Sequence, residues 1–491
     1  MNDRGDGLCF RHRRDSPPLA RECDKLIAMK SARLLFAVAL AASCQAQQMD
    51  WTKIDAEGLR HLQALVQIDS SNGMETRVVD YVKKVFDAEG IPSIVVAKDP
   101  NRANLIARIK GNGSKKPLLI MGHSDTVKVD PAKWINFGPF SGTLSGGYIY
   151  GRGVIDDKSD LFAAMMTTIL LKRTGVKLDR DVIFVSESGE EGASGFGIGY
   201  LVSEHWPQIE PGVCLAEAGG VVRRGGKAVF ATIETTEKVP RGARLVATGV
   251  SGHGSRPMRS NAIVHLSRAV EKIAMWDPPM RLNDTTRTYF EKLAQISEPA
   301  EAQRFRDLLN PSKSAEAREY FAEHEPTFYS MLHTSISPNI IQGGYQTNVI
   351  PSEATATLDI RALPDEDMNA FYALMKNVIN DPAVQIVPGG RAERPIPPPS
   401  SITSEEYHAL EGAFQKVYHV PVLPLMQTGA TDMAQVRAKG VPCYGIGPMV
   451  DEEDGPRGFG IHSDQERMLE EAAYKHLHLF WEAVTAIAAA R

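Results

Sequence analysis

The amino-acid sequence predicts an α/β protein in which a largely parallel sheet is covered by helices on both faces and a smaller ferredoxin-like α+β domain is inserted. Three observations support this prediction. Several segments are uninterrupted apolar runs, as in strands buried on both faces. Helical segments alternate with those runs, which is the order typical of a parallel sheet. After about residue 241 the order becomes strand, helix, two strands, helix and strand, and the alternation then resumes.

The first part of the large sheet is predicted between residues 78 and 220. Apolar residues at helical spacing favour a helix over 78–90, which ends on Gly90. The other elements of this part are a strand pair at 92–97 and 103–111, buried strands within 116–127, 181–188 and 212–220, and a long apolar helix over 160–175.

A second set of elements predicts the inserted domain. In order, they are a strand within 243–255, a helix over 261–276, a charged helical stretch at about 285–330, strands over 334–344 and 353–363, a helix over 368–380 and a short strand at 383–387. Residues 388–401, rich in proline and glycine, read as a linker. A helix over 405–418, the apolar run 441–448 and a C-terminal helix then return to the α/β pattern.

Composition places the chain among ordinary globular proteins. Of its 491 residues 43% are hydrophobic and 23% charged, and the formal net charge is -5. No basic cluster is interleaved with aromatic residues, so the sequence does not indicate nucleic-acid binding.

The N-terminal 48 residues read as a leader. From Met29 the sequence "MKSARLLFAVALAASCQAQQ" has a basic start, an apolar run and small residues, which predicts a signal peptide at about 29–46 and export to the periplasm or medium. The residues before Met29 read as an over-called start. A lipid anchor on Cys44 is less favoured, because "AASC" lacks the usual large aliphatic residue. The run is too short for a stable membrane span, and a buried N-terminal helix is the alternative.

The cysteines do not predict a disulfide framework. Removal of the leader leaves only Cys214 and Cys443, and each lies in an apolar run. We expect both to be buried thiols.

Acidic and histidine side chains gather where the predicted strands end. His123 and Asp125 in "MGHSDTV" are two residues apart, so in an extended chain they project to the same side. A carboxylate so placed can accept the spare ring N–H of a metal-bound histidine. Asp156 and Asp157 stand at the start of the long apolar helix, where acids also serve simply as N-caps.

Three more carboxylates follow strands. Glu190 and Glu191 lie in "SESGEEGASG", directly after a buried strand, and a solvated acidic loop is the simpler alternative. Glu217 ends the apolar run of "CLAEAGG", where an unpaired acid is costly unless it is paired or binds a metal.

His462 lies in "GIHSDQERMLE" near the C-terminus. Ser463 and Glu466 match a capping box, which predicts that His462 sits at a helix entrance. Taken alone, this histidine is better explained as a satisfied core residue.

Together these residues suggest a two-metal centre. Two histidines and three carboxylates suit two borderline-soft divalent ions, zinc most naturally, with cobalt or manganese as alternatives. One bridging acid would give each ion three protein ligands and leave room for a shared water, as in two-metal hydrolases.

At this point the sequence resembles the dizinc exopeptidase and deacylase family. That family includes glutamate carboxypeptidases, aminoacylase, acetylornithine deacetylase, succinyl-diaminopimelate desuccinylase and the carnosine dipeptidases. The resemblance runs from about Trp51 to the C-terminal helix. It rests on an ordered set of motifs: "GHSDTV", "GRGVIDDK", "GEEG", "AEAGG", "GHGSRP", "NVIPSEA", "LDIRALP", "TGATDM" and "IHSDQE".

The resemblance implies a zinc-exopeptidase-like fold and a role for each matched residue. Residues 49–240 and 393–491 would form the catalytic domain, with 241–392 as a lid or dimerisation domain. The implied metal ligands are His123, Asp156, Glu191, Glu217 and His462. Asp156 would bridge, with His123 and Glu217 on one ion and Glu191 and His462 on the other. Asp125 would support His123, and the Asp156–Asp157 peptide would be cis.

The resemblance also implies catalytic and substrate-binding residues. Glu190 matches the general base that moves a proton from water to the leaving amine. His253 matches a histidine that reaches the active site of a partner subunit and stabilises the oxyanion, which implies a homodimer. Asn348, Arg361 and Gly429 match substrate-binding positions, and a surface ion pair of Arg361 with Asp359 or Glu353 is the alternative for that arginine.

The function implied is that of an exported dizinc hydrolase that cleaves an amide bond next to a free carboxylate. A carboxypeptidase or dipeptidase acting on small peptides is preferred, and an N-acyl-amino-acid deacylase is the alternative. A non-catalytic binding protein is a remote third reading, since all five ligands and Glu190 are present. Glu217 in place of aspartate, Ser159 in place of glycine and the charged stretch at 285–330 leave subfamily and substrate open.

Overall fold

The computed structural model describes residues 49–390 and 394–490, so the predicted leader lies outside the described residues. A ten-stranded mixed sheet has the order β1-β2-β6-β3-β7-β17-β9-β8-β18, with β16 also paired to β9. Its strands are β1 (Ser93–Ala97), β2 (Ala103–Ile109), β3 (Leu118–His123), β6 (Val182–Glu187), β7 (Val213–Ala216), β8 (Gly220–Arg224), β9 (Lys227–Glu237), β16 (Val422–Gln427), β17 (Cys443–Gly445) and β18 (Met449–Asp451).

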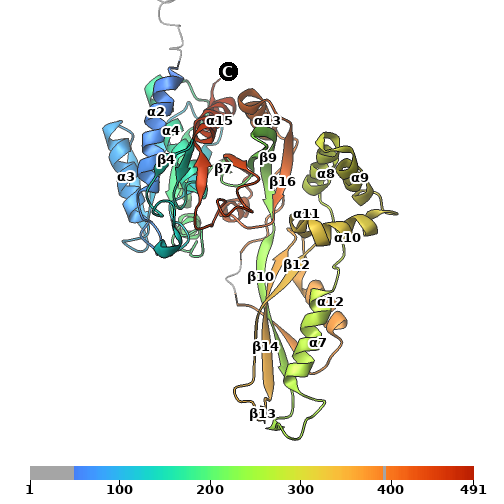
Figure 1. Ribbon diagram of the computed structural model, residues 1–491. Helices are drawn as coiled ribbons and strands as arrows, with labels where there is room; N and C mark the ends of the chain where they lie inside the picture. The colour runs from blue at the N-terminus through green and yellow to red at the C-terminus, as the bar shows by residue number, and fades with distance from the viewer. Residues whose placement is uncertain (1–48, 391–393, 491) are drawn as a thin grey trace, which may run out of the picture. The chain divides into compact units, whose positions relative to one another are not determined.

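The centre of this sheet is parallel, as predicted. The neighbours β6, β3, β7 and β17 all run the same way, whereas β1 and β2 form the expected antiparallel pair at one edge. Strands β3, β6 and β7 are buried along their whole length, and their residues are apolar on both faces except at the ends of β3 and β6, where His123, Ser186 and Glu187 stand. The α/β fold class is therefore confirmed (Figure 1).

Helices cover both faces of the sheet. On β3, Leu119 and Met121 pack in one cluster with α5 (Ile198–Glu204) and α14 (Met433–Arg437). Gly122 faces the other way, where an added Cβ would lie 2.7 Å from the backbone nitrogen of Leu161 in α4 (Lys158–Thr174). Helix α15 (Glu470–Ala488) contacts both α4 and α13 (Glu405–Tyr418). The remaining helices of this part are α2 (Trp51–Val66), α3 (Thr76–Ala88), η1 (Pro131–Lys133) and α6 (Trp206–Ile209).

The second sheet has the strand order of a ferredoxin-like unit. Strands β12 (Ser335–Gly343), β14 (Glu353–Ala362), β10 (Val239–Thr248) and β15 (Val384–Pro388) pair antiparallel in that order. Helices α7 (Ala262–Ala274) and α12 (Met368–Ile379) lie along one side of it (Figure 1). Burial alternates along β14, so every second residue enters the shared core. The exact domain boundaries stay a prediction.

Two small sheets complete the strands. One pairs β11 (Gly252–His253) with β13 (Val349–Ile350). The other has the order β19 (Arg467–Leu469), β5 (Tyr148–Tyr150) and β4 (Thr143–Ser145).

The charged stretch at 285–330 folds into four helices that pack on the large sheet. They are α8 (Asp284–Ile296), α9 (Pro299–Leu308), α10 (Ser314–His324) and α11 (Pro326–Met331). Phe290, Phe305 and Phe321 are buried in a cluster that also holds Phe230 of β9 and Leu423 of β16. In chain order these helices belong to the inserted segment, but their apolar faces extend the core of the main domain.

Lys238 stands at the junction of the two sheets, between β9 and β10. Its ammonium donates hydrogen bonds to the carbonyl oxygens of Ser330 (2.8 Å) and His333 (3.0 Å) and to the hydroxyl of Ser335 (2.8 Å). Burial lowers the pKa of Lys238 to about 7. One buried side chain therefore ties the start of β10 to the end of α11 and the start of β12.

Two smaller findings bear on the sequence predictions. Cys214 and Cys443 are buried free thiols, as expected, and lie opposite each other on β7 and β17. Among the described residues, every helix is too short or too polar to cross a bilayer.

Candidate metal centre

The structure brings the five predicted ligands together as two groups of three. His123, Asp156 and Glu217 form one group, and Asp156, Glu191 and His462 form the other, with ligand atoms within 4.8 Å of one another in each. Asp156 belongs to both. His123 ends β3, and Glu191 and Glu217 lie in the loops after β6 and β7. The carboxyl ends of parallel strands therefore assemble the centre, as in other open α/β sheets.

The two oxygens of Asp156 face different histidines. Oδ1 lies 2.9 Å from Nε2 of His123, and Oδ2 lies 3.2 Å from Nε2 of His462. Glu217 lies 3.8 Å from His123, and Glu191 lies 2.9 Å from His462. This is the arrangement required of a bridging carboxylate with one histidine and one glutamate on each side. The donor set of imidazole nitrogens and carboxylate oxygens fits two divalent ions such as zinc.

The segment before α4 shapes this bridge. The Asp156–Asp157 peptide bond is cis, as the resemblance implied. Asp157 turns away from the ligand atoms, and its Oδ2 accepts a hydrogen bond of 3.0 Å from the backbone N–H of His123. Ser159 donates to the carbonyl of Ile155 at 2.7 Å. The two aspartates thus differ in role. Asp156 lies in the ligand cluster, and Asp157 binds the backbone at the end of β3.

The ionisable groups of the two ligand groups shift one another's pKa values. Burial raises the pKa of Glu217 well above its usual range, and nearby Glu190 adds to the effect. Burial opposes ionisation of Asp156 too, but hydrogen bonds from His123 and His462 outweigh it and hold the pKa of Asp156 below its usual range. The same contacts with Asp156 and Glu191 raise the pKa of His462 to about 10. Several carboxylates packed this closely are chemically suited to bind cations.

Asp125 supports two parts of the centre at once. Nδ1 of His123 lies 3.1 Å from the backbone carbonyl oxygen of Asp125 and 3.3 Å from its Oδ1, so Asp125 contacts His123 as the resemblance implied. Its carboxylate also accepts hydrogen bonds from the backbone N–H groups of Gly189 (2.9 Å), Glu190 (3.1 Å) and Glu191 (3.1 Å). The second role was not evident in the sequence. One carboxylate therefore contacts both a predicted ligand histidine and the loop that carries the two glutamates.

We expect Asp125→Asn to weaken metal binding about 10-fold to 100-fold, the usual effect of losing such a support. An amide keeps one acceptor oxygen but turns an NH2 group toward donors that it cannot satisfy. Competition with a chromogenic chelator measures the affinity. Asp381→Asn is a matched control, because Asp381 pairs with His265 at 2.6 Å outside the centre. Equal metal affinity in the two variants would contradict the assignment.

Glu190 and Glu191 point to different partners. Glu191 contacts His462, whereas Oε1 of Glu190 lies 3.5 Å from Nη2 of Arg394. Arg394 also lies 3.5 Å from the carboxylate of Asp432. Burial, followed by the charge of Asp432, raises the pKa of Glu190 well above its usual range. The adjacent glutamates thus have different partners, the predicted ligand His462 for Glu191 and Arg394 for Glu190.

Arg394 and Asp432 are site residues that the sequence did not identify. Arg394 lies in "RAERPIPPP", which read only as a linker, and Asp432 lies in "TGATDM", which was noted for Gly429. Both face Glu190 and lie at the centre only in the folded chain. The cluster of three charged residues, Arg391, Glu393 and Arg394, at the start of a proline-rich linker was the one available signal.

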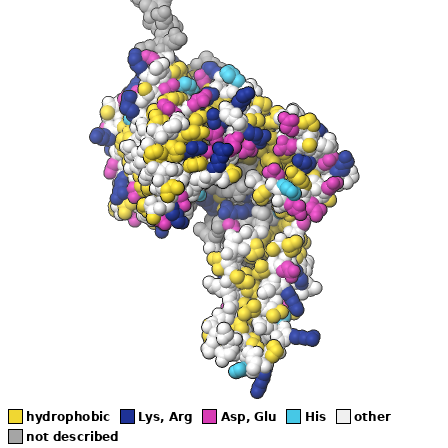
Figure 2. Space-filling view, in the orientation of Figure 1, with side chains coloured by type: hydrophobic (Ala, Val, Ile, Leu, Met, Phe, Trp, Pro, Cys, Tyr) yellow, Lys and Arg dark blue, Asp and Glu magenta, His cyan; other side chains and the backbone are white. Residues whose placement is uncertain are grey.

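A cleft of about 820 Å³ opens beside the glutamates. Its lining includes Glu190, Glu191, Arg361 and Arg394. Arg361 of β14 also pairs with Asp359 at 3.1 Å, so the ion pair named as the alternative for this arginine is present, and its contact with substrate stays a prediction. Ala430, next to Gly429, lines the cleft as well. Basic side chains are visible in a hollow on the face drawn in Figure 2.

His253 and Asn348 lie together but apart from both ligand groups. The strand pair β11–β13 places them side by side, and the N–H of Gly254 donates to the carbonyl of Asn348 at 2.8 Å. Both residues are exposed. The backbone N–H of Ser255 donates to Nδ1 of His253 at 3.1 Å, which leaves the ring proton on Nε2. His253 can therefore offer a donor to a group outside its own strand pair.

The predicted capping box at His462 is wrong. Glu466 instead pairs with the buried Arg152 at 2.7 Å and accepts the N–H of Ile155 at 3.0 Å. Helix α15 begins only at Glu470, and His462 lies in a turn at φ 63°. The carboxylate of Glu466 is fully buried, so the guanidinium of Arg152 is a stronger partner than a helix N-terminus.

Comparisons of the sequence with known proteins agree on one family. The family described as Peptidase family M20/M25/M40 matches residues 119–486. The chain is 30% identical to a probable carboxypeptidase S-like 2 of Dictyostelium discoideum, over 67% of this chain and 64% of that protein. It is 27% identical to the N-fatty-acyl-amino acid synthase/hydrolase PM20D1 of Xenopus tropicalis, over 80% of this chain and 77% of that protein.

Solved structures share the fold. An M20 family metallo-carboxypeptidase from Sulfolobus solfataricus has a TM-score of 0.65 at 19% identity and covers 87% of this chain and 98% of its own. A dinuclear metal binding peptidase of the same family from Bacillus subtilis has a TM-score of 0.57 at 13% identity, covering 89% of this chain and 98% of its own.

Proposed function

The chain belongs to peptidase family M20/M25/M40 and is therefore a metal-dependent amide hydrolase, and we propose that it is an exported carboxypeptidase or dipeptidase for small peptides. One observation carries this proposal: two three-ligand groups share Asp156 beside Glu190 and a cleft that contains Arg361. An amide bond positioned at the metals could then have its neighbouring carboxylate held by an arginine.

Each residue of the centre has a definable task in this proposal. The two ligand groups would hold two ions, proposed to be zinc, which supply Lewis-acid activation of water and of the scissile carbonyl. Glu190 lies beside the ligands without belonging to either group, so its carboxylate is free to take a proton from water and return it to the leaving amine. Arg394, which also pairs with Asp432, holds that carboxylate at the wall of the cleft.

Substrate recognition is assigned to the cleft. The guanidinium of Arg361 can bind both oxygens of a carboxylate, and its pairing with Asp359 keeps it oriented. Gly429 adjoins the cleft at Ala430 and is proposed to contact substrate through its backbone. Asn348 is proposed to act with His253.

We also propose a homodimer. His253 and Asn348 are exposed side by side on the strand pair β11–β13 and are absent from the ligand groups and from the described lining of the cleft. A second chain that contributes them would complete the site, with His253 donating from Nε2 to the developing oxyanion.

An N-acyl-amino-acid deacylase is the second candidate. The relative from Xenopus tropicalis is named for N-fatty-acyl-amino acids, and such compounds carry the same amide and carboxylate as a peptide. The chemistry of the centre serves both substrates equally.

A substrate panel tests the proposal. The zinc-loaded full chain is offered dipeptides, N-acetyl amino acids and the corresponding C-terminal amides, with metal content measured in parallel. We expect about two ions per chain and hydrolysis only where the carboxylate is free. Hydrolysis confined to N-acetyl amino acids would favour the deacylase, and equal hydrolysis of the amides would contradict the role of Arg361.

A further inference from the structure

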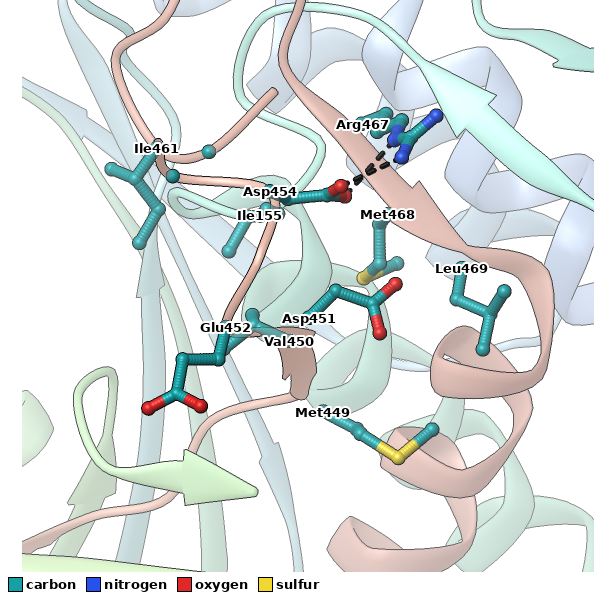
Figure 3. A pocket seen from close by; sticks show the side chains of 12 residues that line it. Ile155, Met449, Val450, Asp451, Glu452, Asp454, Ile461, Arg467, Met468 and Leu469 are labelled. Carbon is teal, nitrogen blue, oxygen red and sulfur yellow. Dashed lines mark hydrogen bonds and ion pairs between the residues drawn. The ribbon is translucent and has the colours of Figure 1, made fainter. Parts of the chain in front are cut away.

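A second hollow lies beside the metal centre. It has a volume of about 240 Å³. Its apolar lining consists of Ile155, Met449, Val450, Ile461, Met468 and Leu469. Figure 3 shows Met468 and Leu469 on one side of this pocket and Ile155 and Ile461 on the other. Thioether and branched aliphatic side chains make an adaptable surface for apolar groups.

The charged residues around this pocket are already paired. Arg467 binds Asp454 at 2.6 and 2.9 Å (Figure 3). Its guanidinium also stacks on Tyr148, 3.9 Å from the ring centroid. Asp451 pairs with Arg223 and accepts the hydroxyl of Tyr148 at 2.7 Å.

Glu452, the third acid at the rim, pairs with Arg224. Each of the three carboxylates thus has a guanidinium partner. The rim has no charge left over for an ionic ligand, so the pocket suits a neutral, apolar occupant.

The position of the pocket indicates what that occupant is. Ile155 directly precedes Asp156, and Ile461 directly precedes His462, so two wall residues adjoin two metal ligands. Ile461 is 52% exposed as a residue, which is unusual for isoleucine but expected at the mouth of an apolar pocket. Among the described residues, this pocket and the cleft with Arg361 have no lining residue in common. The two hollows can therefore receive different ends of one substrate.

We propose that this pocket binds the apolar group on the acyl side of the scissile amide. The proposal rests on the proposed function, because it takes the carboxylate end of the substrate to lie at Arg361. The preferred substrate class is then amphiphilic: a free carboxylate at one end and an aliphatic chain or apolar side chain at the other. The volume holds roughly eight heavy atoms, taking about 30 Å³ for each as in liquid water.

Binding to an inactive enzyme tests the pocket separately from catalysis. Acetyl-, butanoyl-, octanoyl- and hexadecanoyl-glycine are titrated calorimetrically into zinc-loaded Glu190→Ala. Each buried methylene should tighten binding up to about fourfold. We expect octanoylglycine to bind at least 100-fold more tightly than acetylglycine, with little further gain for the hexadecanoyl chain.

Filling the pocket should remove this preference. In the Glu190→Ala background, Val450→Trp is expected to lower the octanoyl-to-acetyl affinity ratio at least tenfold. Leu469→Gln at the partly exposed wall should lower it in the same direction, which guards against a folding defect in the first variant. Val95→Trp, on the exposed edge strand β1, is the matched control and should leave the ratio unchanged.

The outcomes separate the two proposals. Equal affinity for acetyl- and octanoylglycine, with amide hydrolysis by the wild-type enzyme, would overturn the pocket and leave the proposed function standing. A chain-length preference that Val450→Trp removes, without hydrolysis of any amide, would support the pocket and overturn the proposed function.

Discussion

Alanine at Glu190 is expected to stop turnover and keep the metals, whereas alanine at Glu191 is expected to lose metal. Glu190 lies 3.5 Å from Arg394 and belongs to neither ligand group, while Glu191 lies 2.9 Å from His462 and belongs to one. Loss of a positioned general base lowers kcat by about 1,000-fold. Loss of one of three ligands should leave about one ion per chain. Metal analysis and steady-state kinetics on the same samples separate the two effects.

The Glu190→Ala and Glu191→Ala variants serve as controls for each other, because the two residues are adjacent and chemically identical. Glu204→Ala, at an exposed position at the end of α5, controls for loss of surface charge and should match the wild type. The assignment would be wrong if Glu190→Ala kept more than a tenth of the activity, or if Glu191→Ala still bound two ions tightly.

Mixing two inactive variants should restore activity if His253 acts in the partner's site. His253→Ala alone is expected to lower kcat by about 100-fold to 1,000-fold, the usual effect of losing an oxyanion donor. Exchange with Glu190→Ala chains makes half of the dimers mixed. Each mixed dimer has one site with both groups intact, so about a quarter of all sites recover. Activity is followed during subunit exchange, with metal content constant.

A second mixing experiment distinguishes action of His253 in the partner's site from action in the site of its own chain. A chain carrying both His253→Ala and Glu190→Ala is added in excess to wild-type chains. With His253 acting across subunits, the mixed dimers have no intact site, and the activity per wild-type chain falls toward zero. If that activity stays constant although mixed dimers form, His253 serves its own chain or has no role.

The large sheet was predictable because a strand buried on both faces has apolar residues at consecutive positions in the sequence. Strands β3, β6 and β7 are enclosed on both faces, so each is an apolar run up to the polar residues that end β3 and β6. The packing of α8 to α11 was not predictable in the same way. Helical spacing shows which face of a helix is apolar, but not which surface covers it. Phe305 could equally have faced the small sheet, and only the fold places it against β9 and β16.

The site residues also divide into those that the sequence could predict and those that it could not. The ligands stand at strand ends, so topology alone brings His123, Glu191 and Glu217 to one edge. Arg394 comes from a linker, and its place beside Glu190 depends on how the chain returns from the second sheet. Glu466 was misassigned because a short motif cannot reveal a buried competitor, here Arg152.

The Lys238 junction limits how the four-stranded sheet can move. The ammonium is bound to Ser330, His333 and Ser335, and the neighbouring Met331 and Leu332 belong to the aromatic cluster on β9 and β16. A pivot at residue 238 would pull a buried cation from its acceptors, at a cost of several kcal/mol. Closure over a substrate should therefore come from elastic bending of β10, β12 and β14 beyond the junction. The end of the sheet near Lys238 stays fixed to the main domain during this bending.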